Sequence, residues 1–404
     1  MSIPHLPPLP YGRQLISEED VAAVAEALRA DLLTTGPRSA QFERQMAEMT
    51  GAKHAIVVCN ATAALHLAMR VAGVGPGDRT VTSPNTFTAS ANCAAFVGAI
   101  PDFSDIDPVS YNLDPVTLAA GWKPDTKAVV AVDYAGQPAN LPEIARVARA
   151  HGAVVIEDAC HAVGGAFSHE GREWKIGGHP WADLTTFSFH PVKTMTTGEG
   201  GMILTDNDEY AERARILRTH GIVRDARYFT GLGCDENPAF AERGPWYYEM
   251  IDLGWNYRIT DFQCELGMAQ LRHLPRFVAR RREIVARYNE AFADVPWLKL
   301  PGLQPPARPE MTSWHLYTLQ FDFTALGRTR TQVMDVLRTQ WGIGTQVLYI
   351  PVHLQPWYRH TYGYGPGKCP VAETYYTRAL SLPLYPAMTD ADVERVVKGV
   401  LELS

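Results

Sequence analysis

Short apolar runs alternate with helix-like segments along the first half of the chain. Continuous apolar runs, typical of parallel strands buried on both faces, occur at 55–59, 80–83, 128–133, 153–158, 184–189 and 201–205. Segments with apolar residues at helical spacing precede or separate them, at 17–30, 40–49, 60–72, 89–97, 141–150 and 209–220. Strands that alternate with helices predict βαβ units and therefore an α/β fold with a large, mostly parallel sheet.

Two of these helices carry recognisable start signals. Ser17 is a good N-cap, and Asp20 stands three residues later, where a capping box places an acid. The helix at 141–150 is expected to be capped by Asn140, with Pro142 in its first turn.

The pattern changes in the second half. Residues 224–250 are rich in glycine, proline and aromatic residues and are expected to form a loop, followed by helices at 261–271 and 277–292. Residues 296–309 are proline-rich and indicate a boundary, after which a strand at 314–321 and helices at 331–341 and 390–403 are predicted. We therefore expect two domains: a large α/β domain with its N-terminal segment at 1–295, and a smaller C-terminal α+β domain at 296–404.

Composition excludes several classes of protein. The chain has 404 residues, of which 46% are hydrophobic, so it can bury more than one core. Its 37 basic and 44 acidic residues give a net charge of −7, which argues against a nucleic-acid partner. No apolar run approaches the roughly 18 residues that cross a bilayer, so no membrane partner is expected.

Cysteine and histidine usage points to a reducing compartment without a metal site. The six cysteines are scattered and form no C-x-x-C pair, and no signal peptide is evident. We expect reduced core cysteines and a cytoplasmic location. The 13 histidines show no spacing typical of metal ligands, so no metal is predicted.

The first candidate for chemistry is Lys193, which follows an apolar strand and the turn at Pro191 and precedes a glycine-rich run at 198–201. A lysine held out of bulk water can become an amine nucleophile. Most lysines, however, are simply exposed. His190 beside it could act as a general base, although packing in the core is favoured, and Glu199 is open between a loop contact and a substrate contact.

Two further segments suggest a ligand site. Asn60 to Ala64 lies between a strand and a helix, where free N–H groups and the Thr62 hydroxyl could bind phosphate, although Asn60 could be an ordinary helix cap. Asp158 ends a buried strand and needs a cationic partner, such as a protonated ring nitrogen, unless it forms a structural salt bridge or a helix cap. With Ser188 and Lys193, these residues form the set that pyridoxal phosphate requires: a Schiff-base lysine, a carboxylate for the ring nitrogen and a phosphate cup.

The chain resembles the DegT/DnrJ/StrS sugar-nucleotide aminotransferases, which have the aspartate aminotransferase-like fold type I of PLP-dependent transferases. The motifs that carry this resemblance span almost the whole chain: Thr-Thr-Gly-Pro at 34–37, Asn-Ala-Thr-Ala-Ala-Leu at 60–65, Glu-Asp-Ala-Cys-His-Ala at 157–162, Ser-Phe-His-Pro-Val-Lys at 188–193, Gly-Glu-Gly-Gly-Met at 198–202 and Leu-Gly-Trp-Asn-Tyr-Arg-Ile-Thr-Asp at 253–261. Within the family, segments such as Tyr-Gly-Arg-Gln at 11–14 and Tyr-Ile-Pro-Val-His at 349–353 are most similar to a transaminase of pseudaminic acid biosynthesis.

The resemblance implies roles for individual residues. Lys193 and Asp158 would be catalytic. The cofactor, pyridoxal 5'-phosphate or its pyridoxamine form, would be bound by Thr62, Ala63, Phe87, Asp158, His161, Ser188, Lys193 and Asn256. The last of these would reach the neighbouring subunit's phosphate, which implies a homodimer with shared active sites. Weaker expectations for substrate contacts are Thr35, Glu199, Arg258, His315 and Tyr317.

The implied activity is transfer of an amino group from L-glutamate, which becomes 2-oxoglutarate, to a nucleotide-linked 4-keto-6-deoxy sugar. Two departures bear on the substrate: Asn60-Ala61 stands where the family often has Ser-Gly, and Leu348 stands where a histidine is expected. The alternatives are another ketone acceptor (a 3-keto sugar, a cyclitol or a non-sugar compound) and a PLP-binding regulator without catalysis.

Overall fold

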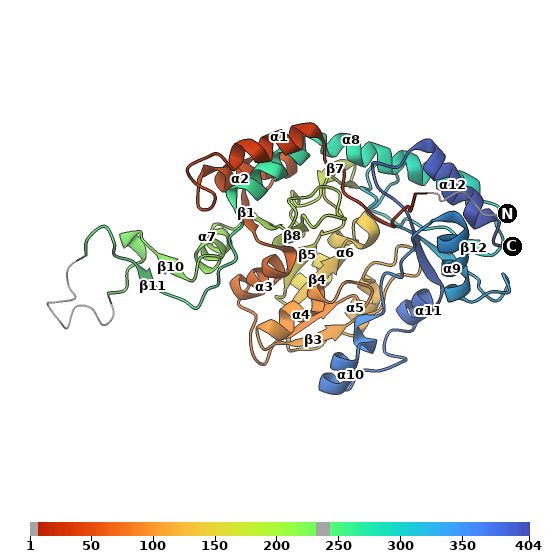
Figure 1. The fold of residues 1–404 in the computed structure, drawn as a ribbon. Coiled ribbons are helices and arrows are strands. Elements are labelled where there is room, and N and C mark those ends of the chain that lie inside the picture. Colours follow the sequence, from red (N-terminus) through yellow and green to blue (C-terminus); the bar gives the residue numbers. More distant parts are fainter. Residues whose placement is uncertain (1–6, 232–242) are drawn as a thin grey trace.

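A seven-stranded sheet lies at the centre of the computed structural model, which describes residues 7–231 and 243–404 (Figure 1). In spatial order its strands are β1 (His54–Val58), β9 (Gly201–Thr205), β8 (Leu184–Ser188), β5 (Val154–Asp158), β4 (Thr126–Val132), β2 (Arg79–Thr82) and β3 (Ile100–Phe103). The strands from β8 to β3 are parallel, and β9 runs antiparallel to both of its neighbours. The predicted mostly parallel sheet is confirmed, although β3 was not among the expected strands.

Helices cover both faces of this sheet, which explains why its strands are apolar without alternation. In β1, Ile56 and Val58 join the core beneath α3 (Ala61–Val71), α4 (Ala89–Phe96) and α7 (Asp208–Leu217). Their neighbours Ala55 and Val57 face the opposite core, to which α2 (Pro37–Thr50) contributes. The remaining helices of this part are α1 (Glu18–Ala27), α5 (Pro115–Ala120) and α6 (Leu141–Arg149).

Cap predictions were partly correct. Ser17 and Asp20 form the expected capping box at the start of α1. Asn140 is the N-cap residue of α6 and Pro142 lies in its first turn, as predicted, but the Asn140 side chain makes no capping hydrogen bond. The short helix α5, capped by Asp114, was not expected at all.

One long helix, α8 (Asp261–Phe292), replaces the two helices predicted at 261–271 and 277–292. It continues through Pro275 because its two halves are anchored in different cores. Cys264, Met268 and Leu274 pack beneath the large sheet, whereas Tyr288 and Phe292 pack with the C-terminal part of the chain. Figure 1 shows α8 running along the top of the molecule from one part to the other.

The C-terminal part is built on a small antiparallel sheet of β12 (Leu298–Lys299), β13 (Tyr317–Phe321) and β14 (Ala379–Leu382). Its helices are α9 (Arg330–Trp341), α10 (Pro356–Tyr362), α11 (Pro370–Arg378) and α12 (Asp390–Leu401). The α+β character is therefore as expected. Because α8 supplies core residues to this part, the boundary at residue 295 stays a prediction.

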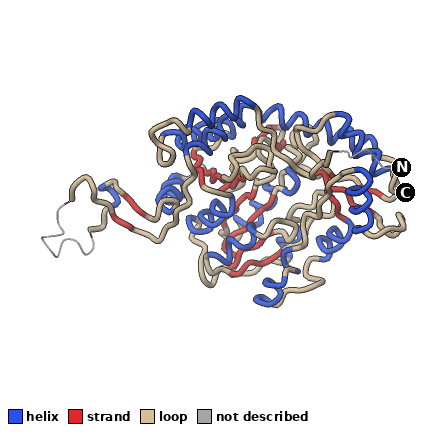
Figure 2. The backbone as a smooth tube through the Cα atoms, viewed as in Figure 1, coloured by secondary structure: helices blue, strands red, loops and turns tan. Residues whose placement is uncertain are grey.

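Two hairpin-like pairs complete the fold. β6 (Ala166–His169) pairs with β7 (Arg172–Lys175). β10 (Ile222–Val223) pairs with β11 (Glu249–Met250), and the pair forms an arm that extends from the body (Figure 2). β11 lies within the segment expected to be loop, and β10 lies just before it. Short 3-10 turns occur at Tyr134–Gly136, Ala226–Tyr228 and Val352–Leu354. No helix in the described ranges has the length and apolar character needed to cross a bilayer.

Candidate active site

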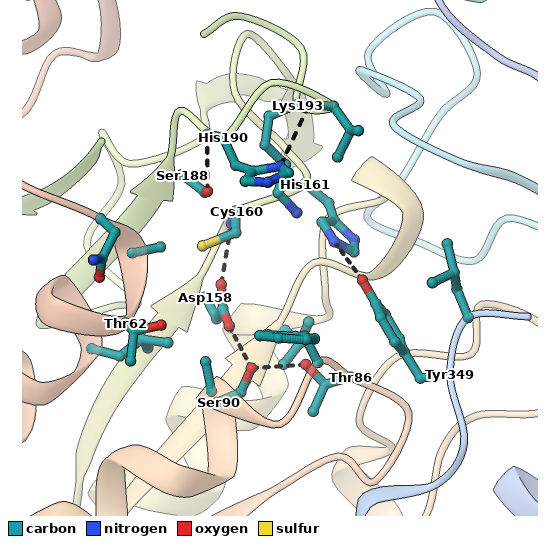
Figure 3. A pocket seen from close by; sticks show the side chains of 18 of the residues that line it. Thr62, Thr86, Ser90, Asp158, Cys160, His161, Ser188, His190, Lys193 and Tyr349 are labelled. Carbon is teal, nitrogen blue, oxygen red and sulfur yellow. Dashed lines mark hydrogen bonds between the residues drawn. The ribbon is translucent and has the colours of Figure 1, made fainter. Parts of the chain in front are cut away.

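Asp158 and Lys193 line one cavity of about 330 Å³ at the carboxyl ends of the parallel strands. Asp158 is the last residue of β5, and Ser188, the last residue of the neighbouring β8, lines the same cavity. Because β5 and β8 are parallel, their carboxyl ends meet at one edge of the sheet, where ligands of open α/β sheets bind. Figure 3 shows the Asp158 and Lys193 side chains around the same space.

The Asp158 carboxylate is almost fully buried and accepts hydrogen bonds on both oxygens. Ser90 Oγ donates to Oδ2 at 2.6 Å, and the Cys160 N–H donates to Oδ1 at 3.2 Å. Its side chain also lines the cavity, so a further donor from a bound ligand can reach it. This is the environment expected of an acid that faces a protonated ring nitrogen.

Lys193 is held by the turn that follows β8. Its N–H donates to the His190 carbonyl at 2.9 Å, and its side chain enters the cavity. Burial lowers the pKa of the Lys193 amine, and the nearby Cys160 and Asp158 oppose that shift only in part. The amine is therefore easier to deprotonate than that of an exposed lysine, as a nucleophile or proton carrier requires.

His161 follows the turn after Asp158 and lines the same cavity. Its Nε2 lies 3.3 Å from the Tyr349 hydroxyl, and its ring centroid lies 4.4 Å from that of His315. Burial and the neighbouring Lys193 hold the pKa of His161 well below its usual range, so the imidazole is neutral. Its buried Nδ1 has no hydrogen-bond partner in the described part of the chain, which leaves this atom for a ligand.

The other end of the cavity is formed by Asn60, Ala61 and Thr62 at the start of α3. Asn60 Oδ1 accepts the Ala63 N–H at 2.8 Å, so the helix-cap interpretation of Asn60 is confirmed. The first N–H groups of a helix lack intrahelical partners, and together with the helix dipole they attract phosphate. Ala63 itself is buried and is not among the lining residues, because its N–H is turned toward Asn60.

Three further residues line the cavity from its open side. Phe87 is 60% exposed, so one face of its ring is available for stacking on a planar ligand. Glu199 is exposed and lines the cavity, as a substrate contact requires. His190, expected to pack in the core, is instead exposed and lines the cavity, so that expectation was wrong.

Several expected contacts lie outside the cavity lining. Tyr317 is fully buried in the C-terminal core, where its hydroxyl donates to Asn289 Oδ1 at 2.9 Å, so it cannot reach a substrate in this cavity. His315 is one layer behind His161, in ring contact with it. Arg258 is partly buried and does not line the cavity.

Thr35 and Asn256 are exposed and also lie outside the lining. The Thr35 hydroxyl donates to the carbonyl of Thr34 at 2.6 Å within the same exposed turn. Asn256 pairs through its backbone with Thr219 in an isolated bridge. Neither side chain serves the cavity of its own chain, and the expected contact of Asn256 with a neighbouring subunit stays a prediction.

Sequence reasoning gave no role to several lining residues, among them Thr86 and Ser90, which lead to Asp158, and Tyr349, which comes from the C-terminal part. No spacing rule could have found this pair, because Thr86 lies in the bend before α4 and only Ser90 lies in the helix. Tyr349 could not be found in this way, because its partner His161 lies 188 residues away in the sequence.

Comparison with known proteins decides the class of this protein. A model of the DegT/DnrJ/EryC1/StrS aminotransferase family matches residues 14–401. The chain belongs to this family. It is therefore a PLP-dependent aminotransferase, as the sequence motifs and the paired Lys193 and Asp158 implied.

The relatives are similar along the whole chain. The spore coat polysaccharide biosynthesis protein SpsC of Bacillus subtilis is 42% identical over 397 residues, covering 98% of this chain and 97% of SpsC. The structure of Helicobacter pylori PseC, an aminotransferase involved in the biosynthesis of pseudoaminic acid, superposes with a TM-score of 0.86 at 28% identity, covering 98% of this chain and 99% of PseC. Spr1654 of Streptococcus pneumoniae, solved in a PLP form, gives a TM-score of 0.85 at 26% identity, covering 98% of each chain.

The residues present fit pyridoxal phosphate. The cavity combines an amine of lowered pKa, a buried carboxylate with room for another donor, and a helix N-terminus. The unpartnered Nδ1 of His161 adds a polar contact for a ligand. Among the described residues, no cluster of three or more histidine, cysteine or acidic side chains could hold a metal ion.

Proposed function

We propose that this protein transfers the amino group of L-glutamate to the ketone of a nucleotide-linked 4-keto-6-deoxy sugar. The observation that carries amino transfer is the joint presence of Lys193 and Asp158 in one buried cavity. Bound pyridoxal phosphate supplies an electron sink for the carbanion that forms at the amino-acid α-carbon. The side chains of this chain supply binding, orientation and proton transfer.

Lys193 holds the cofactor and then moves protons. Because burial lowers the pKa of its amine, the freed Nζ is neutral in a larger fraction of molecules and can accept the α-proton of glutamate. The same Nζ returns a proton in the second half of the cycle, when the sugar ketone becomes an amine. 2-Oxoglutarate leaves between the two halves.

Asp158 would accept a hydrogen bond from the protonated ring nitrogen and so hold the proton there. Thr62, Ser188 and the first N–H groups of α3 bind the phosphate, and Phe87 covers one face of the ring. Neutral His161, oriented by the Tyr349 hydroxyl at 3.3 Å, offers its free Nδ1 near the ring. These contacts fix the cofactor while Lys193 is detached from it.

The names of the relatives support a sugar acceptor. SpsC is named for polysaccharide biosynthesis, and PseC for pseudoaminic acid biosynthesis. Together with the segments at 11–14 and 349–353, they favour UDP-4-amino-4,6-dideoxy-N-acetyl-β-L-altrosamine as the product. We further infer a cytoplasmic homodimer, supported by the free cysteines of the described residues and by Asn256, which is exposed and does not line its own cavity.

The experiment is a coupled assay with the purified protein, L-glutamate and the corresponding UDP-linked 4-keto sugar. We expect one 2-oxoglutarate per amino sugar formed, with the product identified by NMR and mass spectrometry. Asp208→Asn, which changes an exposed carboxylate remote from the cavity, is the matched control for Asp158→Asn. If no amino sugar forms with this acceptor while 2-oxoglutarate is still released, the proposed sugar acceptor is wrong, but the proposed amino transfer from glutamate still holds.

A second candidate is amino transfer to another ketone, such as a 3-keto sugar, a cyclitol or a non-sugar compound. Leu348 favours it, because an apolar side chain lines the cavity where a histidine was expected. A panel of these acceptors, compared by kcat/KM with glutamate held constant, separates the two candidates. If the preferred acceptor carries no nucleotide, the second candidate function is established.

A further inference from the structure

A chain of two hydroxyl groups leads to the Asp158 carboxylate along the wall of the cavity. Ser90 Oγ lies 2.6 Å from Asp158 Oδ2, and Thr86 Oγ1 lies 2.7 Å from Ser90 Oγ. Ser90 is 1% exposed and Thr86 is 3% exposed, so water does not compete for these bonds. Figure 3 shows the three side chains in one line of hydrogen bonds.

The direction of this chain follows from its last member. Ser90 Oγ is the donor to Asp158 Oδ2, so its only hydroxyl proton is used in that bond. Ser90 can then only accept from Thr86, which makes Thr86 the donor of the other bond. Both hydroxyl dipoles therefore point toward the carboxylate, and each bond strengthens the next.

A merely structural serine would behave differently here. Ser90 lies in the first turn of α4 (Ala89–Phe96), and a serine in a helix commonly bonds a nearby backbone carbonyl. Its hydroxyl instead reaches an acid 68 residues away in the sequence. Phe87 lies just before the same helix. The short segment from Phe87 to Ser90 therefore supplies both the side chain that covers the cofactor ring and the hydroxyl that bonds Asp158.

We propose that Ser90, backed by Thr86, is a positioning residue that holds the Asp158 carboxylate in place and directs it at the cofactor ring nitrogen. The proposal rests on the role of Asp158 given above, and it concerns how that role is maintained. With Ser90 on Oδ2 and the Cys160 N–H on Oδ1, the plane of the carboxylate is fixed from two separate elements. The remaining acceptor capacity is left for the ring.

Other titratable groups also interact with Asp158, so the variants used in a test must leave those residues unchanged. Asp158 interacts electrostatically with five titratable groups: Cys93, Asp133, Cys160, Lys193 and Tyr349. None of them is altered by a substitution at Ser90 or Thr86.

The test measures the ring nitrogen directly. Pyridoxal phosphate labelled with ¹⁵N in the ring is bound to the full-length protein, and its NMR shift is followed with pH in the absence of substrate. In Ser90→Ala we expect the ring nitrogen to lose its proton at lower pH than in the wild type. We also expect cofactor affinity, measured by equilibrium dialysis, to fall roughly ten-fold or more, as for a bond to a charged group.

Three further variants separate the possible explanations. Asp158→Asn should deprotonate the ring nitrogen most strongly. Thr86→Val should shift its titration in the same direction by less, and it keeps the test valid if Ser90→Ala does not fold. Ser381→Ala is the matched control, since it removes an equally buried hydroxyl that bonds Thr318 in the small sheet at 2.8 Å, away from the cavity.

Three outcomes would contradict the proposed roles of Ser90 or Asp158. A wild-type ring-nitrogen titration in both Ser90→Ala and Thr86→Val, with a shift in Asp158→Asn, would overturn the positioning role while leaving the function intact. A wild-type titration in Asp158→Asn would overturn the proposed role of Asp158 itself. A shift in Ser381→Ala as large as that in Ser90→Ala would reduce Ser90 to a packing residue.

Discussion

Lys193 illustrates how burial changes the chemistry of an ordinary residue. Taking a charged amine out of water disfavours its protonated form, and this is the largest cause of the lowered pKa of Lys193. The charges of Cys160 and Asp158 oppose the shift without cancelling it. A lysine in this cavity is therefore available as a neutral amine at lower pH than a lysine in solvent.

In the cofactor-free protein, we expect the rate of Lys193 acetylation to reach half its plateau below pH about 10.4, the value for free lysine. The midpoint lies at lower pH because only the neutral amine reacts, and an amine of lower pKa is neutral at lower pH. Asp158→Asn should move the midpoint lower still, since it removes a charge that raises the pKa. Mass spectrometry of the peptide that contains residue 193 gives the rate, and a midpoint at or above that of free lysine would refute the burial argument.

Single residues were predictable where chemistry and position coincide. Asp158 ends a strand and Lys193 follows a strand and its turn, so the pattern made them candidates, and their combination and the family resemblance assigned their roles. The substrate contact predicted for Tyr317 was wrong, because this tyrosine lies in a strand buried on both faces. Its hydroxyl donates to Asn289 in the core instead. The hydroxyl of Ser90 and the partner of His161 depend on contacts between distant segments, and these contacts arise only once the sheet has formed.

At the level of elements, the cavity depends on a close approach between β9 and the start of α3. Gly201 begins β9, and a Cβ there would lie 2.6 Å from the Ala61 N and as close to the Asn60 backbone. Backbone atoms cannot rotate away as a side chain can. The glycine therefore sets how closely the phosphate end of the cavity is held against the sheet.

Gly201→Ala is expected to destabilise the protein by about 1–3 kcal/mol, as overpacking commonly does, and to weaken cofactor binding. Gly75→Ala is the control, because a Cβ at that position would meet nothing within 4 Å. Thermal unfolding and equilibrium dialysis measure the two effects. Equal stability and affinity in the two variants would show that the close approach is not needed.

Most elements followed from the hydrophobic pattern, and the exceptions have physical causes. β3 was missed because Pro101 and Asp102 interrupt its apolar run, yet an edge strand tolerates a proline. The sequence analysis predicted two helices in place of α8, because the middle of this segment has no strong apolar repeat. The helix continues because both halves are buried in cores that the sequence pattern does not reveal.

At the scale of the whole molecule, Asp102 connects the large sheet to the C-terminal part. Its carboxylate lies 2.9 Å from an Arg79 nitrogen, 3.0 Å from Lys123 Nζ and 2.7 Å from Lys368 Nζ. Burial alone would raise its pKa, but the bonds from Lys368 and Lys123 lower the pKa of Asp102 to about 2. This depressed pKa links folding stability to acid pH.

The contribution of Asp102, about 2 kcal/mol at most, is present above its ordinary pKa of 3.8 and is lost as pH falls through about 2. Lys368→Met should therefore lower stability near neutral pH and flatten its dependence on pH below 4. Lys53→Met, which breaks an exposed pair with Asp208, should change stability little. Denaturant unfolding at several pH values tests this, and an unchanged acid slope in Lys368→Met would contradict it.

The proposed shared site predicts complementation between two inactive variants. Lys193→Ala removes the lysine of one site, and Asn256→Ala removes the residue proposed to reach the neighbouring phosphate. After mixing, unfolding and refolding, a hybrid dimer contains one site with Lys193 and the partner's Asn256 both intact. We expect activity to reappear in the mixture but in neither variant alone, and a mixture without activity would contradict the shared site.

The most direct test of the whole account is to identify the residue that holds the cofactor. Borohydride reduction of the protein loaded with pyridoxal phosphate fixes the cofactor to the amine that binds it, and mass spectrometry of peptides locates the added mass. We predict the added mass at Lys193 in the wild type and none in Lys193→Ala. Stoichiometric labelling of any other lysine in the wild type would contradict the account.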